Sequence, residues 1–273
     1  MTGQFAERII CLTEETTETL YLLEEDWRIV GISGFTVRPP HARKEKPVIS
    51  TFTNARIDEI VALAPDLVLG FSDIQADIAS QLITAGLEVH IFNQRTVSGI
   101  LRMIRQLGAL IGRVPQACQL AQQLEDNLQA ASQPVQVRPR VYFEEWNDPL
   151  ISGIGWVSEL IEQAGGKDVF GDLAGKSLAK HRIIHDPQEV VRRNPDIIIG
   201  SWCGKPFRTE QINARCGWEE INAVRNQEIH EIDSSIILQP GPAALTDGFD
   251  RLQEIICHWR SSQDTKFRGA TSG

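Results

Sequence analysis

The sequence contains no run of about 18 apolar residues and no long run of Lys or Arg. A helix that spans a bilayer needs such an apolar run, so we expect no membrane-embedded segment. The formal net charge is -9 and the isoelectric point is near 5.2, which disfavours nucleic acid and anionic membrane surfaces as partners. The first residues, MTGQFAERIICLTEE, lack a basic segment followed by an apolar stretch of export length, so the chain as written is expected to be neither exported nor inserted.

Cysteine pairs and catalytic signatures are also sparse. The cysteines are odd in number and form no Cys-x-x-Cys pair, which predicts reduced thiols and favours the cytoplasm. They are Cys11, Cys118, Cys203, Cys216 and Cys257. No Gly-x-Ser-x-Gly motif occurs, and Gly153 and Gly155 lack the third glycine of a dinucleotide fingerprint. The stretch GDLAGKS, residues 171–177, has three residues between Gly and Gly-Lys where a phosphate loop has four. We therefore expect no catalytic residue set.

One twelve-residue pattern occurs twice in the chain. EIVALAPDLVLG covers residues 59–70 and EVVRRNPDIIIG covers residues 189–200, with Glu, Val, Pro, Asp and Gly identical. In each copy a segment with helical spacing runs into Pro-Asp and is followed by a short aliphatic run. A proline ends a helix, and an uninterrupted aliphatic run is typical of a strand that is buried on both faces of a parallel sheet. The pattern therefore predicts a helix, a turn and a buried strand in each half.

Further short aliphatic segments alternate with helical segments in both halves. They are RIICL (8–12), RIVGIS (28–33), EVHIF (88–92), RVYFE (140–144) and EIHEI (228–232). The helical segments include IQADIASQLITAG, WVSELIEQAGG and DGFDRLQEIICHW. This alternation predicts an α/β fold with two Rossmann-like βα lobes.

A long helical segment separates the two halves. PQACQLAQQLEDNLQAA, residues 115–131, begins with a proline suited to a first helical turn and carries its leucines on one stripe. We expect this one long backbone helix to join the lobes. The expected organisation is an N-terminal lobe at 1–113, the backbone helix and linker at 114–137, and a C-terminal lobe at 138–273. The polar residues 261–273 are expected to be disordered.

Ligands of open α/β sheets bind where the carboxyl ends of parallel strands meet. Two such lobes facing each other would form a cleft. The residues directly after the two duplicated strands are Phe71, Ser72 and Asp73 in one lobe and Ser201, Trp202, Cys203, Gly204 and Lys205 in the other. We therefore expect a ligand cleft between the lobes, with one wall from each copy.

Several segments resemble a known family. RIICLTEETTETLYLL, RIVGISGFTVRPPHA and VISTFTNARIDEIVALAPDLVLG are similar to the N-terminal lobe of the class III substrate-binding proteins of ABC importers, in particular the cobalamin-binding branch. PLISGIGWVSELIEQAGGKDVFGD and PDIIIGSW continue the resemblance, which covers about residues 8–257. The resemblance implies a rigid backbone helix, little closure on binding, and a corrinoid, haem or ferric siderophore between the lobes. It implies a periplasmic location, and the missing export segment leaves the cytoplasm as the alternative.

The resemblance also assigns positions to the ligand and to the permease. Phe35, Phe52 and Phe71 correspond to aromatic positions that contact the ligand, and Trp202 and Gly204 lie in the corresponding loop of the second lobe. The acidic helix starts that dock the permease correspond to Asp58 or Glu59 and to Gln188 or Glu189.

Two positions depart from the family pattern. Arg182 stands near the place of a ligand-stacking tryptophan. Glu14 and Glu15 replace the usual Pro-Ser of the first loop, which adds negative charge to the cleft.

A large planar ligand needs broad apolar contact and a few polar groups that fix its orientation. The aromatic residues in or next to the predicted strand-end loops either contact the ligand or pack between loop and sheet. The proline-rich loop that starts at Gln239 is expected to overhang the cleft as a rigid element. The full set of candidate ligand-binding residues is Glu15, Phe35, Phe52, Phe71, Ser72, Glu145, Trp146, Trp156, Arg182, Trp202, Cys203, Gly204, Gln239 and Pro240.

Three features allow other chemistry. Glu144 and Glu145 would accept hydrogen bonds from corrinoid amides, act as acid and base in an enzyme, or remain solvated. Cys203 would ligate cobalt or iron, or simply pack. His181 and His185 have zinc-ligand spacing, but Asp186-Pro187 with Glu189 forms a helix start that leaves His185 outside the helix, so we expect no metal site.

The sequence therefore predicts a monomeric, non-catalytic protein that binds a corrinoid (cobalamin) as a ligand and not as a prosthetic group, with an ABC permease as partner. A ferric-siderophore or haem binding protein is the alternative within the same class. A cytoplasmic enzyme or carrier, acting on a corrinoid or metal chelate through Cys203 and the two glutamates, is the alternative from another class.

Overall fold

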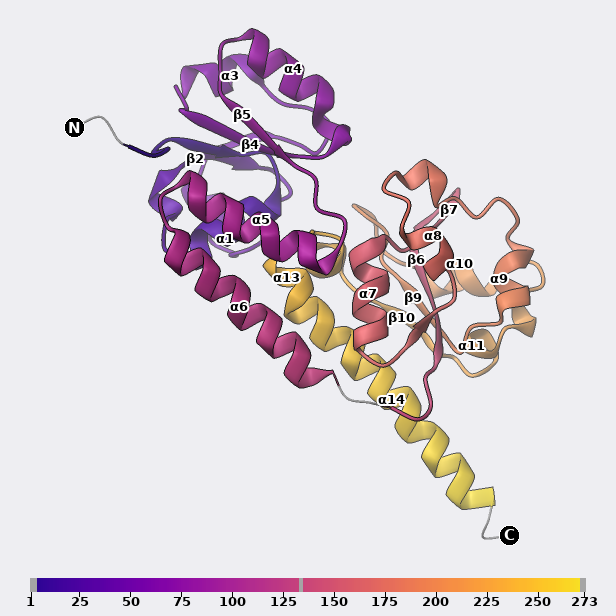
Figure 1. Ribbon diagram of the computed structural model, residues 1–273. Coiled ribbons are helices and arrows are strands. Elements are labelled where there is room, and N and C mark those ends of the chain that lie inside the picture. The colour runs from indigo at the N-terminus through magenta and orange to yellow at the C-terminus, as the bar shows by residue number, and fades with distance from the viewer. Residues whose placement is uncertain (1–3, 133–134, 271–273) are drawn as a thin grey trace. The chain divides into compact units, whose positions relative to one another are not determined.

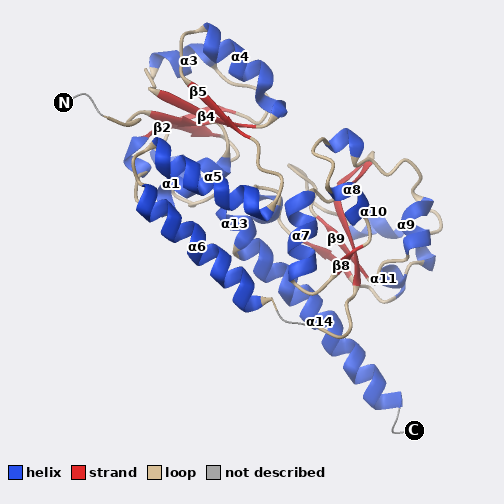
Figure 2. Cartoon of the chain, in the orientation of Figure 1, coloured by secondary structure: helices blue, strands red, loops and turns tan. Residues whose placement is uncertain are grey.

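The computed structural model describes residues 4–132 and 135–270, and their side chains up to residue 263. The chain forms two compact α/β units, which confirms the predicted fold class (Figures 1 and 2). The N lobe comprises the residues up to Gln94, Ser98–Asp126 and Pro240–Pro242. The C lobe comprises Arg95–Val97, Asn127–Gln239 and the residues from Ala243 onward. The division therefore falls within the helix α6 (Val114–Ala131).

The N lobe is built on a parallel five-stranded sheet in the order β3-β2-β1-β4-β5. Its strands are β1 (Ile9–Cys11), β2 (Ile29–Ser33), β3 (Val48–Ser50), β4 (Leu67–Phe71) and β5 (Val89–Phe92). All residues of β1 and β4 are buried, as their uninterrupted aliphatic sequences predict. The three-residue strand β3 was not predicted.

Helices cover both faces of this sheet. In Figure 1, α3 and α4 lie on one side of the strands, and α1, α5 and α6 lie on the other. The bounds are α1 (Glu14–Leu22), α2 (Ala42–Glu45), α3 (Ile57–Ala62), α4 (Ala76–Thr84) and α5 (Val97–Leu110), with short 3₁₀ turns at η1 (Asp26–Arg28) and η2 (Asp73–Gln75). Ile60 of α3 and Ile78 and Leu82 of α4 pack against strand residues such as Ile10 and Val68.

The C lobe is built around the long strand β6. β6 (Arg140–Asn147) pairs with β9 (Ile197–Gly200), which pairs with β10 (Ile229–Glu231), and both pairings are parallel. β7 (Leu150–Ser152) pairs antiparallel with the carboxyl end of β6, and β8 (Lys167–Asp168) pairs parallel with its start. β7 and β8 were not predicted, and β6 extends three residues beyond the predicted strand.

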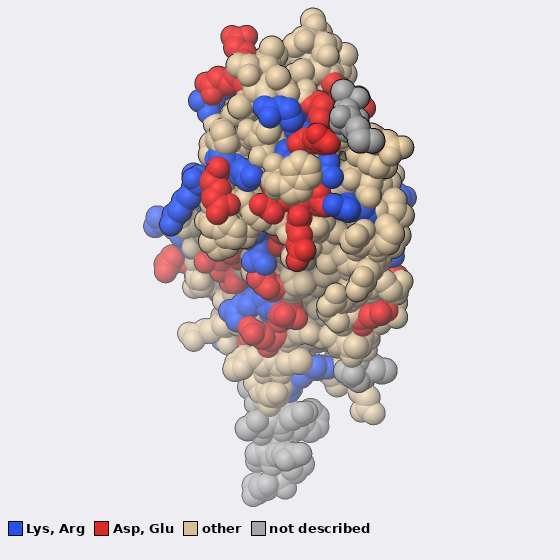
Figure 3. Space-filling model, turned by 90° about the vertical axis from the view of Figure 1, so that its left-hand side faces the viewer, with Lys and Arg blue, Asp and Glu red and all other residues tan. Residues whose placement is uncertain are grey.

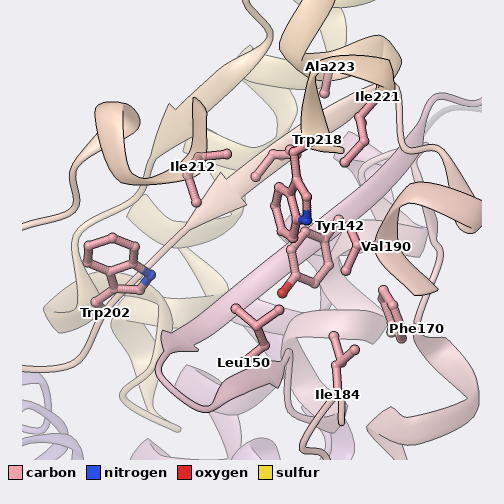
Figure 4. Close-up of a cluster of buried hydrophobic side chains, with 11 residues drawn as sticks. Tyr142, Leu150, Phe170, Ile184, Val190, Trp202, Ile212, Trp218, Ile221 and Ala223 are labelled. Atoms are coloured by element: carbon pink, nitrogen blue, oxygen red, sulfur yellow. The ribbon is translucent and has the colours of Figure 1, made fainter. Parts of the chain in front are cut away.

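Helices and buried aromatic residues complete the C lobe. The helices are α7 (Gly155–Gln163), α8 (Gly171–Ala174), α9 (Gln188–Arg193), α10 (Thr209–Asn213), α11 (Asn222–Arg225), α12 (Ser234–Ile237), α13 (Pro242–Leu245) and α14 (Asp247–Ala270), with 3₁₀ turns at η3 (Ala179–His181) and η4 (Trp218–Glu220). Tyr142 of β6, Phe170 and Trp218 form the centre of one core cluster (Figure 4). α14 continues to Ala270 and contains no proline, and no glycine lies between Gly248 in its first turn and Gly269. This differs from the disorder expected over 261–270, and residues 271–273 lie outside the described residues.

The duplicated pattern has the same local geometry in both lobes. α3 and α9 are followed by Ala64 and Asn194, whose φ angles of 45° and 39° turn the chain before Pro-Asp. The carboxylate of Asp66 then accepts hydrogen bonds from the backbone N–H groups of Glu7 (2.7 Å) and Arg8 (3.0 Å), just before β1. In the second copy, Asp196 accepts from the N–H of Arg140 at the start of β6 (2.9 Å).

In each lobe, an arginine at the start of the neighbouring strand also binds the end of the helix that precedes the Pro-Asp turn. We call this contact and the aspartate hydrogen bonds the Pro-Asp anchor. Arg8 donates to the carbonyl oxygens of Leu63 (2.5 Å) and Ala64 (3.0 Å) at the end of α3. Arg140 donates in the same way to the carbonyl of Arg193 at the end of α9. Each Pro-Asp turn is therefore bound to the amino end of the neighbouring strand, which fixes the register of two adjacent strands.

The glycine that ends each copy leaves room for a side chain from the following loop. A Cβ on Gly70 would lie 2.8 Å from Oε1 of Gln75, and one on Gly200 would lie 1.9 Å from the ring of Phe207. Gln75 is fully buried and joins three strand ends. Its amide accepts from the N–H of Phe71 (2.9 Å) and donates to the carbonyls of Leu12 (3.3 Å) and Phe52 (3.2 Å).

The anchor predicts a specific stability effect. Asp66→Ala removes two hydrogen bonds to a carboxylate and should lower the free energy of unfolding by about 2 kcal/mol, measured by urea denaturation. Asp77→Ala, an exposed aspartate of α4, is the matched control and should change it by less than about 0.5 kcal/mol. Equal losses in the two variants would contradict a special role for the Pro-Asp anchor.

Candidate functional site

The strand ends of the N lobe carry an exposed aromatic pair. Phe35 follows β2 and Phe52 follows β3, and their ring centroids lie 5.9 Å apart in an edge-to-face arrangement. Phe35 is 43% exposed, and Phe52 is half-buried. Phe71, in contrast, is only 6% exposed. Two of the three phenylalanines predicted to contact the ligand therefore offer a joint aromatic surface.

Ser72 sits in a strained turn directly after β4. Its φ angle is 56°, and its hydroxyl accepts a hydrogen bond from the N–H of Ile74 (3.4 Å). Ser72 also lines a hollow of about 600 Å³ between α4 and β5, together with Ile83 and Ile91. The chain thus reverses sharply at the end of the first duplicated strand.

Glu15 is a buried carboxylate in the first turn of α1. It is 1% exposed, and its Oε1 accepts a hydrogen bond from the hydroxyl of Thr13 (2.8 Å). Oε2 has no hydrogen-bond partner among the described residues. Burial raises the pKa of Glu15 from 4.5 to about 7. The side chain is therefore poised to change charge near neutral pH.

The loop that contains Pro240 passes directly over Glu15. A Cβ on Gly241 would lie 2.5 Å from Cβ of Glu15, so only glycine permits this approach. The carbonyl of Pro240 accepts a hydrogen bond from Nε2 of Gln94 (2.9 Å), and Gln239 is buried. The predicted rigid loop is thus fixed against the N lobe by its backbone.

The strand ends of the C lobe hold two ion pairs on β6. Glu144 is fully buried and accepts hydrogen bonds from Tyr142 (3.0 Å), Trp202 Nε1 (3.0 Å) and Arg215 (2.6 and 2.8 Å). Glu145 lies at an irregularity in the pairing of β6 with β7 and has a different partner.

Glu145 makes a bidentate ion pair with Arg182 (2.6 and 3.0 Å), and Arg182 is 1% exposed. Arg182 also donates to the carbonyl of Ser152. Glu144 and Glu145 therefore have separate partners. Each of the two carboxylates that the enzyme alternative would use as acid and base is held by an arginine.

A cation and two indole rings lie at the carboxyl ends of β6 and β9. Nζ of Lys205 lies 3.8 Å from the ring centroid of Trp146 and 5.2 Å from that of Trp202. Trp202 is held by Glu144 and also contacts the ring of Phe207 at 4.9 Å. The intervening residues are Cys203, which is exposed, and Gly204, whose φ of 75° suits glycine.

Some predicted ligand contacts lie in the interior. Trp156 is 2% exposed, and its Nε1 donates to the carbonyl of Ile237 (2.9 Å), which joins α7 to α12. This is the packing role that the sequence left open for it. Arg182 and Trp202 are equally buried and are held by carboxylates. The exposed or half-buried members of the predicted C-lobe set are Glu145, Trp146, Cys203 and Gly204.

Two of the three candidate docking carboxylates, Glu59 and Glu189, are paired within their own lobes. Glu59 pairs with Arg56 at 2.8 Å, and Asp58 is exposed beside it. Glu189 pairs with Arg192 (2.7 Å) and Arg193 (2.8 Å).

Hydrogen bonds from Arg193 and Arg192 lower the pKa of Glu189. The expected capping box at α9 is only half formed. The Asp186 carboxylate accepts from the N–H of Gln188 (3.0 Å), while Glu189 turns to the arginines.

The described part of the chain contains no group of three or more His, Cys, Asp or Glu residues arranged to hold a metal ion. His185 and Cys216 line a hollow of about 550 Å³ in the C lobe, together with Leu150, Arg215 and Trp218. His181 ends η3 and is not among the residues that line it.

Surface charge and helix composition add two observations. On the face drawn in Figure 3, acidic and basic side chains are interspersed and form no single basic patch. Among the described helices, none has the length and apolar composition needed to cross a bilayer.

Sequence reasoning missed the positioning role of Gln75 and the stacked position of Lys205. Gln75 had no signal except its distance of five residues from Gly70. Lys205 follows the second duplicated strand closely, but the sequence does not reveal that Trp146 lies beneath it. Contacts between distant segments require the fold.

The buried Glu15 predicts a pH-dependent stability. Below pH 4.5 the carboxyl is protonated in both states, whereas between 4.5 and about 7 only the unfolded chain ionises. The folded state therefore loses stability as pH rises through this window, by about 3 kcal/mol in total. Glu15→Gln should match the parent near pH 4.5 and exceed it near pH 8, measured by urea denaturation. A constant difference at both pH values would show that Glu15 ionises normally in the folded chain.

The chain is similar to known periplasmic and substrate-binding proteins. The family described as "Periplasmic binding protein" matches residues 9–236. A protein of Salmonella typhi named "Vitamin B12-binding protein" is 30% identical over 212 residues, which cover 76% of this chain and 77% of that protein. A Bacillus subtilis (strain 168) protein named "Uncharacterized ABC transporter substrate-binding lipoprotein YvrC" is 25% identical over 262 residues, which cover 92% of this chain and 80% of that protein.

Solved structures show the same fold. A possible iron-binding (periplasmic solute-binding) protein from Staphylococcus epidermidis has a TM-score of 0.78 and 26% identity, and the match covers 93% of this chain and 99% of that one. The periplasmic heme-binding protein RhuT from Roseiflexus sp. RS-1 has a TM-score of 0.76 and 24% identity over 92% and 99% of the two chains. Since the family match spans most of the sequence, the chain belongs to the periplasmic binding protein family.

Proposed function

We propose that this chain is the solute-binding component of an ABC importer and that it binds a corrinoid without chemical turnover. The observation that carries the proposal is the chemistry of the strand-end residues, where an aromatic pair with one exposed ring occurs together with buried carboxylates that hold Arg182 and Arg215. The relative named as a vitamin B12-binding protein supports the same ligand. In this proposal the corrinoid contacts strand-end loops of both lobes.

The charge of the ligand distinguishes a corrinoid from haem and from ferric siderophores. Haem carries two carboxylates and ferric siderophores are often anionic, so both call for available cations. Arg182 and Arg215 are bound to Glu145 and Glu144, and Glu15 adds a further carboxyl. A corrinoid ring instead carries neutral amide side chains, whose N–H groups donate to carboxylates. Its apolar faces suit the Phe35–Phe52 surface.

Axial ligation points in the same direction. Haem iron in proteins is held by His, Cys, Met or Tyr. Tyr142 is fully buried and donates to Glu144, and Tyr21 lies at the far end of α1, where it donates to Glu45. Cobalamin already carries its own axial groups and needs none from the protein. Among the predicted ligand residues, Cys203 is the one that belongs to the residue types that hold haem iron.

The second candidate is a haem or ferric-siderophore binder. It is favoured by the structural neighbours described as a possible iron-binding protein and as a periplasmic heme-binding protein. An exposed thiol at Cys203 would supply the axial ligand in that case.

The ligand is tested by calorimetry and visible absorption with cyanocobalamin, haemin and a ferric hydroxamate. We expect saturable binding of cyanocobalamin at one site, with a Kd in the micromolar range or tighter, and recovery of unchanged ligand after release. The double variant Phe35→Ala/Phe52→Ala should weaken it about tenfold because the aromatic surface is lost. Trp27→Ala, an exposed aromatic elsewhere in the N lobe, is the control and should bind normally. Binding of haemin alone would overturn the corrinoid proposal.

The importer partner is tested separately from the ligand. Glu59→Lys with Glu189→Lys should abolish delivery of ligand to the cognate permease in proteoliposomes and leave ligand affinity unchanged. The matched control reverses Glu125 and Glu254, which also lie one in each lobe and also pair with an arginine. Intact delivery by the first double variant would refute docking through these carboxylates.

A further inference from the structure

Lys205 occupies a fixed position at the strand ends of the C lobe. Its ammonium lies 3.8 Å from the centroid of Trp146 and 5.2 Å from that of Trp202, and it donates a hydrogen bond to Oδ1 of Asn147. The residue is half-buried. Cation–π contacts and the amide acceptor therefore restrict a side chain that is normally mobile, and a restricted cation binds an anion with a smaller loss of entropy.

Lys205 has no ion-pair partner among the described residues. Arg182 and Arg215 of the same lobe are each held by two oxygens of a carboxylate, Glu145 and Glu144 respectively. The polar partner of Lys205 is instead a neutral amide. A cation that is held in place without a carboxylate partner offers its charge to an anion.

We propose that Lys205 binds an anionic group of the ligand, and that for a corrinoid this group is the phosphodiester of the nucleotide loop. The inference rests on the proposed corrinoid function and narrows the ligand to corrinoids that carry the nucleotide loop. A complete cobalamin presents one phosphodiester anion, whereas its other side chains are neutral amides.

A phosphodiester and a haem propionate are both oxyanions carried by a large planar ligand. Either would pair with the ammonium group of Lys205. Dicyanocobinamide separates these sources, because it has the corrin ring and its amides but lacks the phosphodiester.

The experiment measures the Kd of cyanocobalamin and dicyanocobinamide for the parent protein and for three variants. In the parent, cyanocobalamin should bind about tenfold more tightly, as expected for one charge-assisted contact. Lys205→Gln should weaken cyanocobalamin about tenfold and leave dicyanocobinamide unchanged. Lys205→Arg keeps the charge and should retain most of the preference. Lys167→Gln removes an exposed lysine at the opposite end of β6 and should change neither Kd.

A general loss of structure would weaken both corrinoids together, so the ratio of the two Kd values isolates the charge contact. The ratio in the parent should also fall as salt concentration rises, because the contact is electrostatic. If Lys205→Gln leaves the ratio unchanged, the inference fails and the corrinoid function stands. If neither corrinoid binds the parent, the proposed function fails. In that case the Kd of haemin decides whether Lys205 binds an anion. A tenfold weaker binding of haemin by Lys205→Gln would support a contact with a haem carboxylate, and an unchanged haemin Kd would refute the anion contact.

Discussion

Each lobe depends on one interaction, the hydrogen bonds that an aspartate carboxylate accepts from backbone N–H groups at the start of the neighbouring strand. Asp66 accepts from the two residues just before β1, and Asp196 accepts from the residue that begins β6. The preceding proline and the left-handed turn deliver each aspartate to this point, and Arg8 and Arg140 close the contact from the strand side. Because the amino ends of the strands are fixed in this way, their carboxyl ends and the loops that follow them are fixed as well.

The sequence was sufficient to predict most of the strands because their signals are local, whereas the aspartate contacts, which join residues 56 to 59 positions apart, were not predicted. Aliphatic runs, helical spacing and Pro-Asp turns identify β1, β2, β4, β5, β6, β9 and β10 without knowledge of distant contacts. Strands of two or three residues, such as β3 and β8, carry too little pattern to be recognised. The pairing of Glu145 with Arg182 and the interior position of Trp156 were also invisible, because residues 30 or more positions apart meet only in the fold.

The two lobes present different chemistry at equivalent strand ends. In the N lobe, the glycine of the repeat makes room for Gln75, whose amide joins three loops below the exposed Phe35–Phe52 surface. In the C lobe, the equivalent glycine makes room for Phe207, and ion pairs neutralise the arginines. Lys205 then remains as a fixed positive charge above two indole rings. One lobe thus offers aromatic contact and the other offers a charge.

The most direct test of this account is a crystal structure of the protein with bound cyanocobalamin. The account predicts electron density for one corrinoid in contact with Phe35 and Phe52, with its phosphodiester within hydrogen-bond distance of Nζ of Lys205. A corrinoid bound at the amino ends of the strands, or with its phosphodiester turned to solvent and away from Lys205, would contradict it.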